Sequence, residues 1–196
     1  MSGVDLRRFP RIATDRLLLR ECSDADAADI LHFRGDREVQ KYNTDPMRDE
    51  AEARGLIRTM SAWYVTRQAI QWGITLHDED RVIGICGLHD WSRRHRRAYV
   101  GYDLAREHWS KGLGQEAMSA VLRFAFDHLE LHRLEAITVA ENARSIRLLE
   151  ALGFQREGLR REYSLEPDGA YHGSAIYGLL RHEYDAWASL QTAAED

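Results

Sequence analysis

The sequence HWSKGLGQEA at residues 108–117 places two glycines and a run of backbone N–H groups ahead of an amphipathic segment. Glycine permits backbone angles and a close approach to a ligand that a side chain would block. We therefore expect the amides from Lys111 to Gln115 to open a helix that runs from Gln115 to about Leu129. Because these N–H groups lack intrahelical partners and lie at the positive end of the helix dipole, the stretch predicts an anion site. A glycine pair before a helix is also common in plain loops, so this interpretation depends on the rest of the chain.

Length and composition indicate one domain. The 196 residues, 44% hydrophobic and 30% charged, are enough for one substantial core and few for two. We expect a single domain over residues 1–196, with a flexible arm at 1–12 and a tail at 183–196. The net charge of -5 argues against direct binding to nucleic acid and suits a cationic or amine substrate better. The run Arg93–Arg97 could contact RNA, but charge in a hairpin turn is usually solvated.

The remaining composition excludes several classes of protein. Cys22 and Cys86 lie far apart in apolar settings, which favours neither a disulfide framework nor a zinc site. His128 and His132 lack an acidic partner that would complete a metal site, so we expect no metal. No apolar run reaches the roughly 18 residues that span a bilayer, and the first residues lack the apolar centre of a signal peptide. We therefore expect a cytoplasmic protein with no membrane partner, and the oligomeric state stays open, a homodimer included.

Hydrophobic periodicity predicts an alternation of helices and strands. Segments with period 2 or with continuous apolar residues indicate strands at 16–21, 71–77, 81–89, 98–104, 134–140, 154–165 and 170–180. Apolar residues at helical spacing indicate helices at about 24–35, 49–67, 115–129 and 143–151, a short segment at 37–42 and a short helix at 183–190. The turn at 167–169 joins the last two strands into a hairpin.

Several separated motifs now resemble one known family. They are TDRLLLR at 14–20, GY at 101–102, WSKGLG at 109–114 with EA at 116–117, Asn142 with Ser145, and GF at 153–154 with EG at 157–158. In this order they resemble the GCN5-related N-acetyltransferase (GNAT) superfamily, and within it the ribosomal-protein N-terminal acetyltransferase (RimJ/RimL-like) branch. Several motifs in the right order are much harder to obtain by chance than one glycine loop.

The resemblance implies an α/β fold with flanking helices. Its mixed, largely antiparallel sheet splays between the fourth and fifth strands, which end at Leu104 and Ala140, to admit acetyl-CoA. The pyrophosphate would bind the amides of the loop, and the pantetheine arm would lie along the strand edge from Tyr102 to Leu104. The residues expected to contact the cofactor are Tyr102, Leu104, Trp109, Lys111, Gly112, Leu113, Gly114, Gln115 and Asn142. Simple packing remains an alternative for Trp109, and a helix cap remains one for Asn142.

The resemblance implies two catalytic residues. Ser145 would protonate or steady the departing thiolate, although a first-turn serine can also satisfy a backbone amide. Glu162, in the last hairpin, would be the best remaining carboxylate for the general base, although an exposed strand residue is the more common role at such a position. Three positions depart from the pattern: many relatives carry a glutamate where this chain has Tyr99, a tyrosine acid where it has Leu149, and an aspartate where it has Gly173.

We expect an acetyl-CoA-dependent N-acetyltransferase that moves the acetyl group directly to a primary amine. By the resemblance, this amine is the N-terminal α-amino group of a protein such as a ribosomal protein. A small-molecule amine, such as an antibiotic or a polyamine, is the first alternative. A CoA-binding sensor without turnover is an alternative of another class, which the departures at Tyr99 and Leu149 support.

Overall fold

The computed structural model of the chain describes residues 5–166 and 168–195, with side chains up to residue 190. Its strands are β1 (Ile12–Ala13), β2 (Leu17–Arg20), β3 (Ile70–Leu76), β4 (Val82–Ser92), β5 (Arg97–Leu104), β6 (Arg133–Val139), β7 (Gln155–Leu165) and β8 (Tyr171–Leu180). Its α-helices are α1 (Ala27–Arg34), α2 (Arg37–Gln40), α3 (Glu50–Val65), α4 (Leu113–Arg123), α5 (Ala143–Ala151) and α6 (Arg181–Glu195). Pro167, in the predicted turn at 167–169, lies outside the described residues.

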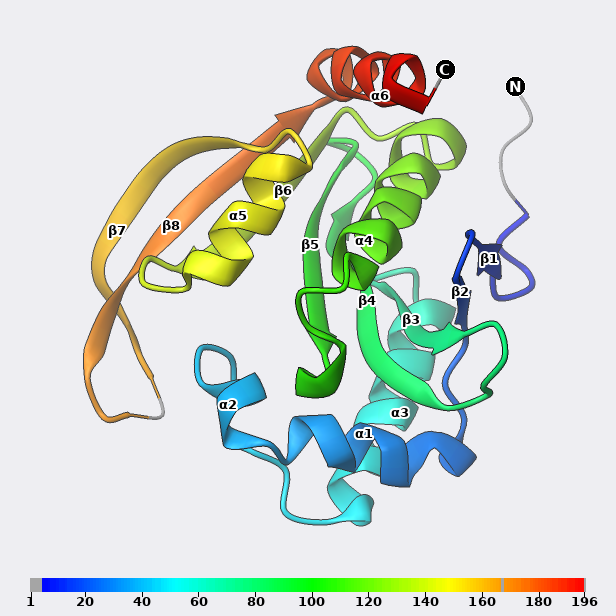
Figure 1. The fold of residues 1–196 in the computed structure, drawn as a ribbon, viewed down its shortest axis with the longest axis vertical. Coiled ribbons are helices and arrows are strands. Elements are labelled where there is room, and N and C mark those ends of the chain that lie inside the picture. Colours follow the sequence, from blue (N-terminus) through cyan, green and yellow to red (C-terminus); the bar gives the residue numbers. More distant parts are fainter. Residues whose placement is uncertain (1–4, 167, 196) are drawn as a thin grey trace.

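The strands form one sheet in the order β1-β2-β3-β4-β5-β6-β8-β7. All neighbours pair antiparallel except β5 and β6, which are parallel. These two strands pair only near their first residues, up to Tyr99 opposite Glu135, and then separate towards Leu104 and Val139 (Figure 1). The predicted fold class is confirmed, including the splay between these strands. The structure adds β1, a two-residue strand that the periodicity did not indicate.

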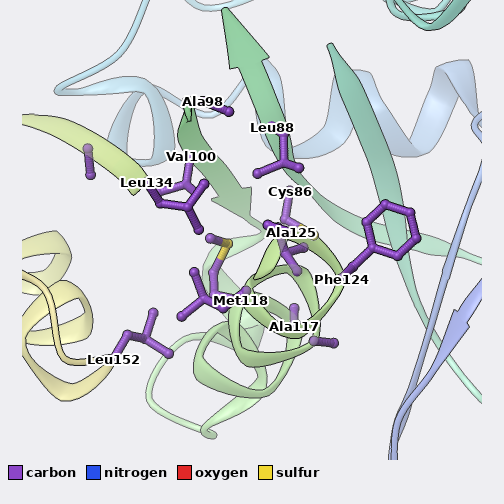
Figure 2. Packing of buried hydrophobic residues seen from close by; sticks show 14 of the residues in the cluster. Cys86, Leu88, Ala98, Val100, Ala117, Met118, Phe124, Ala125, Leu134 and Leu152 are labelled. Atoms are coloured by element: carbon purple, nitrogen blue, oxygen red, sulfur yellow. The ribbon is translucent and has the colours of Figure 1, made fainter. Parts of the chain in front are cut away.

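The main core lies between the sheet and α4. Figure 2 shows side chains of β4, β5 and β6, among them Leu88, Val100 and Leu134, gathered against the helix that carries Ala117 and Met118. Met118 and Leu134 are fully buried. Burial of each large apolar side chain contributes roughly 1.5–3 kcal/mol. This packing therefore fixes α4 against the strands β5 and β6 that separate from each other.

A second apolar cluster lies under α1 and α3, where Ile30, Phe33, Ile57 and Met60 pack with Ile85 of β4. The helical spacing of these residues gives each helix one apolar face, as the sequence predicts. α1 leads directly into α2 (Figure 1), and Asn43, just after α2, donates through Nδ2 to Asp103 near the end of β5. This cluster therefore positions the segment after α2 beside the end of β5 that diverges from β6.

The arm predicted at residues 1–12 does not lie free from residue 5 onwards. Phe9 packs on Tyr64, with ring centroids 4.7 Å apart, and Trp72 Nε1 donates to the Pro10 carbonyl at 2.7 Å. This part of the predicted arm therefore packs on the aromatic edge of the core, and its flexibility stays a prediction. Residues 1–4 lie outside the described residues.

The tail expected at 183–196 belongs to α6, which begins at Arg181 and ends at Glu195 and is therefore longer than the predicted helix at 183–190. Trp187 Nε1 donates to the Ala151 carbonyl at 3.0 Å and joins this helix to the end of α5. Residue 196 lies outside the described residues. No helix in the described part of the chain is long and apolar enough to cross a membrane.

Candidate active site

The predicted anion-binding loop, residues 108–112, ends at a glycine with a left-handed backbone conformation. Gly112 has φ +76° and serves as the N-cap of α4, which begins at Leu113 and not at Gln115 as predicted. Leu113 is buried against the core, so the apolar face of the helix starts two residues earlier than the glycine pair suggested. The first intrahelical bond joins Glu116 N–H to the Gly112 carbonyl at 3.0 Å. The N–H groups of Leu113, Gly114 and Gln115 therefore lack intrahelical acceptors.

The helix does not end where it was expected either. After Arg123 the chain continues as a π-helical turn, Phe124–His128, so the helical segment covers 113–128 in place of 115–129. The π-helical turn buries Phe124 and Phe126.

Ionic contacts hold this loop against the start of β2. Glu116 accepts from Thr14 Oγ1 at 2.6 Å and pairs with Arg16 Nε at 2.6 Å. Arg16 also donates through Nη1 to the Lys111 carbonyl at 3.0 Å. Burial opposes ionisation of Glu116, but the bonds from Thr14 and Arg16 outweigh it and hold its pKa below the ordinary value. The loop is therefore pre-shaped by the sequence at 14–16, a hundred residues earlier.

A cavity of about 380 Å³ opens between the diverging ends of β5 and β6. It brings together Tyr102, Leu104, Trp109, Gly112, Leu113, Gly114, Gln115, Asn142 and Ser145 from the predicted site. Lys111 and Glu162 are not among its lining residues. Lys111 was expected among the residues that open the helix, but it precedes the N-cap Gly112 and its carbonyl accepts from Arg16 Nη1.

Trp109 links the loop to both sides of the splay. Its Nε1 donates to the Leu104 carbonyl at 2.7 Å, and the guanidinium of Arg144 lies 3.4 Å from its ring centroid. Packing is therefore part of its role. Arg144 and Arg147, both of which line the cavity, were missed by the sequence reasoning. Their spacing of three on a predicted helix, which places two cations on one face, was the signal that could have found them.

Asn142 is the N-cap of α5, because its Oδ1 accepts from Ser145 N–H at 3.2 Å. The cap is observed, and contact with the cofactor stays a prediction. The hydroxyl of Ser145 does not make this cap; it shares a hydrogen bond of 2.8 Å with the hydroxyl of Tyr102. Burial raises the pKa of Tyr102 to about 12.

The cavity contains an acidic side chain that the sequence did not single out. Asp103 is 6% exposed, pairs with Arg34 of α1 and accepts from Asn43 Nδ2. Burial raises its pKa against the opposing effects of Arg34 and Asn43. His108 also lines the cavity, and burial lowers its pKa. No local spacing links Asp103 to Arg34, because their pairing depends on how α1 packs on the sheet.

Glu162 lies elsewhere. It is an exposed residue of β7 with φ +47°, in a segment where the register with β8 shifts between Arg160 and Ser164. Such a left-handed backbone is uncommon for a residue other than glycine. The structure therefore does not bring Glu162 together with the cavity, and its role as base stays a prediction.

Comparison with known proteins decides the family. Residues 16–155 match the acetyltransferase (GNAT) domain. The chain belongs to this family. YoaA, an uncharacterized N-acetyltransferase of Bacillus subtilis (strain 168), is 36% identical to this acetyltransferase over 174 residues, which cover 88% of this chain and 98% of that protein.

Two further proteins resemble this acetyltransferase. The ribosomal protein uS5-alanine N-acetyltransferase of Escherichia coli (strain K12) is 29% identical over 180 residues, 89% of this chain and 92% of that protein. The solved structure of spermidine N-acetyltransferase from Vibrio cholerae, in complex with CoA and spermine, has a TM-score of 0.77 at 23% identity, over 87% of this chain and 99% of that chain. The predicted family is confirmed, and the relatives include an enzyme of the ribosomal-protein branch.

The acetyltransferase is an enzyme that uses acetyl-CoA as cosubstrate, and its cavity fits that molecule. A Cβ added at Gly114 would meet only Leu148 Cδ2, at 3.7 Å, so the glycine leaves space beside the free amides. Those amides and the guanidinium of Arg144 suit the phosphates of CoA. Within the described part of the chain, no group of three or more His, Cys, Asp or Glu side chains could hold a metal ion.

Proposed function

We propose that this acetyltransferase acetylates the N-terminal α-amino group of a protein, with a ribosomal protein as the acceptor class. The name of the Escherichia coli relative supports the acceptor class. The observation that carries the proposal is the weakness of the bases beside the cavity. Among its described lining residues, the only carboxylate is Asp103, already paired with Arg34 and Asn43, and the only imidazole is His108.

A site with weak bases selects amines that are already neutral. The unperturbed pKa of an α-amino group is about 7.7–8.0, and that of lysine is about 10.4. At neutral pH a useful fraction of N-termini is uncharged, whereas only roughly one lysine in a few thousand is. The carboxylate of Asp103 is occupied by its ion pair with Arg34 and is not free to accept a proton from the substrate. The pKa of His108 lies below its usual value. Both groups are therefore poorly matched to removing a proton from lysine.

The residues of the cavity then have separate tasks. When bound, acetyl-CoA supplies an activated acetyl thioester. The amides of Leu113 to Gln115 hold its phosphates, and the Ser145 hydroxyl donates towards its sulfur. Transfer forms a bond between the amine nitrogen and the acetyl carbon and breaks the carbon–sulfur bond, whose electron pair stays on sulfur. The proton that the nitrogen loses goes to water.

The test uses pairs of peptides that share one sequence except at a single internal position and at the N-terminal group. One peptide has a free N-terminus and no lysine, and the other is blocked at its N-terminus and carries an internal lysine. We expect kcat/KM for the free N-terminus to be at least about tenfold higher at neutral pH, a difference of about 1.4 kcal/mol. The ratio should fall as the pH rises from about 7 to about 9, because lysine continues to lose its proton after the α-amino group is neutral.

Acetylation is located by mass spectrometry of the peptides. A preference for the internal lysine, or for a polyamine over every peptide, would exclude the N-terminal acceptor while leaving the acetyltransferase activity in place. The absence of any CoA release with peptides and polyamines together would favour a sensor. Comparison of ribosomal proteins from cells with and without this chain then identifies the acceptor.

A further inference from the structure

Two hydroxyl groups meet across the splay. Tyr102 comes from β5 and Ser145 from the first turn of α5, and both line the cavity. Their oxygens are 2.8 Å apart. Because Asn142 Oδ1 already accepts from Ser145 N–H, the Ser145 side chain is not needed to cap the helix. The contact between the hydroxyls therefore requires another explanation.

We propose that Tyr102 is a positioning residue for Ser145: it donates its hydroxyl proton to Ser145 Oγ and leaves the Ser145 O–H to donate towards the departing sulfur. The inference rests on the acetyl transfer described under the proposed function. It is independent of which amine is the acceptor, because it concerns only the sulfur side of the reaction.

The direction of the hydrogen bond follows from acidity. A phenol is a stronger acid than an aliphatic alcohol, so Tyr102 is the better donor of the pair. It keeps its proton at neutral pH, since burial holds its pKa at about 12. When Ser145 Oγ accepts from Tyr102, the Ser145 hydroxyl proton is free to donate to the sulfur. The first hydrogen bond then polarises the Ser145 O–H and makes it a stronger donor in the second. A thiolate accepts from that donor more strongly than a thioester sulfur, so the arrangement favours the transition state over the ground state.

Tyr99 provides a matched control on the same strand. Side chains alternate along β5, so Tyr99 faces away from the side that holds Tyr102. Its hydroxyl bonds to Glu135, and it does not belong to the lining of the cavity as described. Tyr99→Phe removes one tyrosine hydroxyl from β5 but leaves the contact with Ser145 in place.

The first measurement concerns bound CoA and needs no turnover. The ultraviolet absorbance of the thiolate is followed while the pH is raised, for the unaltered protein, Tyr102→Phe, Ser145→Ala and the double variant. We expect the bound thiol of the unaltered protein to have a lower pKa than free CoA. Each single variant should raise that pKa by about one unit, and the double variant by no more than either single change. Tyr99→Phe should leave it unchanged.

The second measurement is turnover with any amine that the enzyme accepts. We expect kcat to fall about tenfold in each single variant and in the double variant alike, with KM for acetyl-CoA unchanged. Thermal unfolding shows whether each variant is folded. Tyr102→Leu removes the same hydroxyl and replaces Tyr102→Phe if the latter does not fold.

Two results would overturn the inference. An unchanged thiol pKa in Tyr102→Phe, beside a raised one in Ser145→Ala, would mean that the tyrosine does not act through the serine. Additive effects in the double variant would mean that the two hydroxyls act separately. Neither result bears on the choice between N-termini and lysine, which the peptide experiment decides on its own.

Discussion

At the scale of single residues, Gly114 offers the sharpest test of the phosphate loop. Valine at this position would place methyl groups beside the free amides of the first turn of α4, while a Cβ itself meets only Leu148 at 3.7 Å. We predict that Gly114→Val weakens acetyl-CoA binding at least tenfold, about 1.4 kcal/mol, and that the protein still folds. Isothermal calorimetry and thermal unfolding measure the two effects.

Gly55, in the middle of α3, supplies the control for this prediction. A Cβ there would approach only the end of the Arg58 side chain, at 4.0 Å. Gly55→Val should leave the affinity unchanged. Equal affinity of Gly114→Val and Gly55→Val for acetyl-CoA would remove the helix start from the cofactor site.

At the scale of elements, Glu116 joins α4 to the start of β2 through Thr14 and Arg16. Its side chain is 17% exposed, so these charge-assisted bonds are only partly screened by water. We predict that Glu116→Gln lowers the free energy of unfolding by about 2 kcal/mol at neutral pH. The exposed Glu21, just after β2, provides the control, and Glu21→Gln should change stability by no more than about 0.5 kcal/mol.

The same carboxylate predicts a dependence on pH. Its pKa in the folded protein lies below the ordinary value of 4.5, so its stabilising effect is complete above about pH 4.5 and is lost as the pH falls through the folded pKa. Urea unfolding at several pH values should therefore show the difference between the unaltered protein and Glu116→Gln shrinking in this acidic window. A difference that stays constant to the lowest pH would show that the effect is steric and not ionic.

At the scale of the whole molecule, the segment before β1 closes one edge of the core. Phe9 packs on Tyr64 and Trp72 and is partly buried. We predict that Phe9→Ala costs about 2 kcal/mol, less than a fully buried phenylalanine, and lowers the unfolding temperature by roughly 4–8 °C. Val65→Ala, at a position that is 74% exposed, is the control and should leave the temperature nearly unchanged. An unaltered unfolding temperature in Phe9→Ala would mean that this segment does not stabilise the core and would support the predicted flexible arm.

The sequence by itself determined the fold class, and all but one of the residues that it predicted for cofactor contact line the cavity. The strands and helices follow from apolar periods of 2 and 3.6, which are local properties of the chain. Gly112 and Gly114 marked the loop because the backbone angles that glycine permits are also local. Asn142 and Ser145 were singled out by the resemblance to the family, with the place of Asn142 between a strand and a helix beside it. Even here the helix start was two residues off, since the burial of Leu113 against the core is not visible in the local pattern.

Only the tertiary structure decided which side chains meet across the splay. Tyr102 reaches Ser145, and Asp103 reaches Arg34, because strand register and helix packing bring distant segments to one cavity. A shift of one residue in the register of β5 would turn both side chains to opposite faces. For the same reason Glu162, which the order of motifs placed in the site, lies on an exposed bulge away from the cavity. Local sequence encodes the elements, whereas contacts between them depend on the packing of the whole chain.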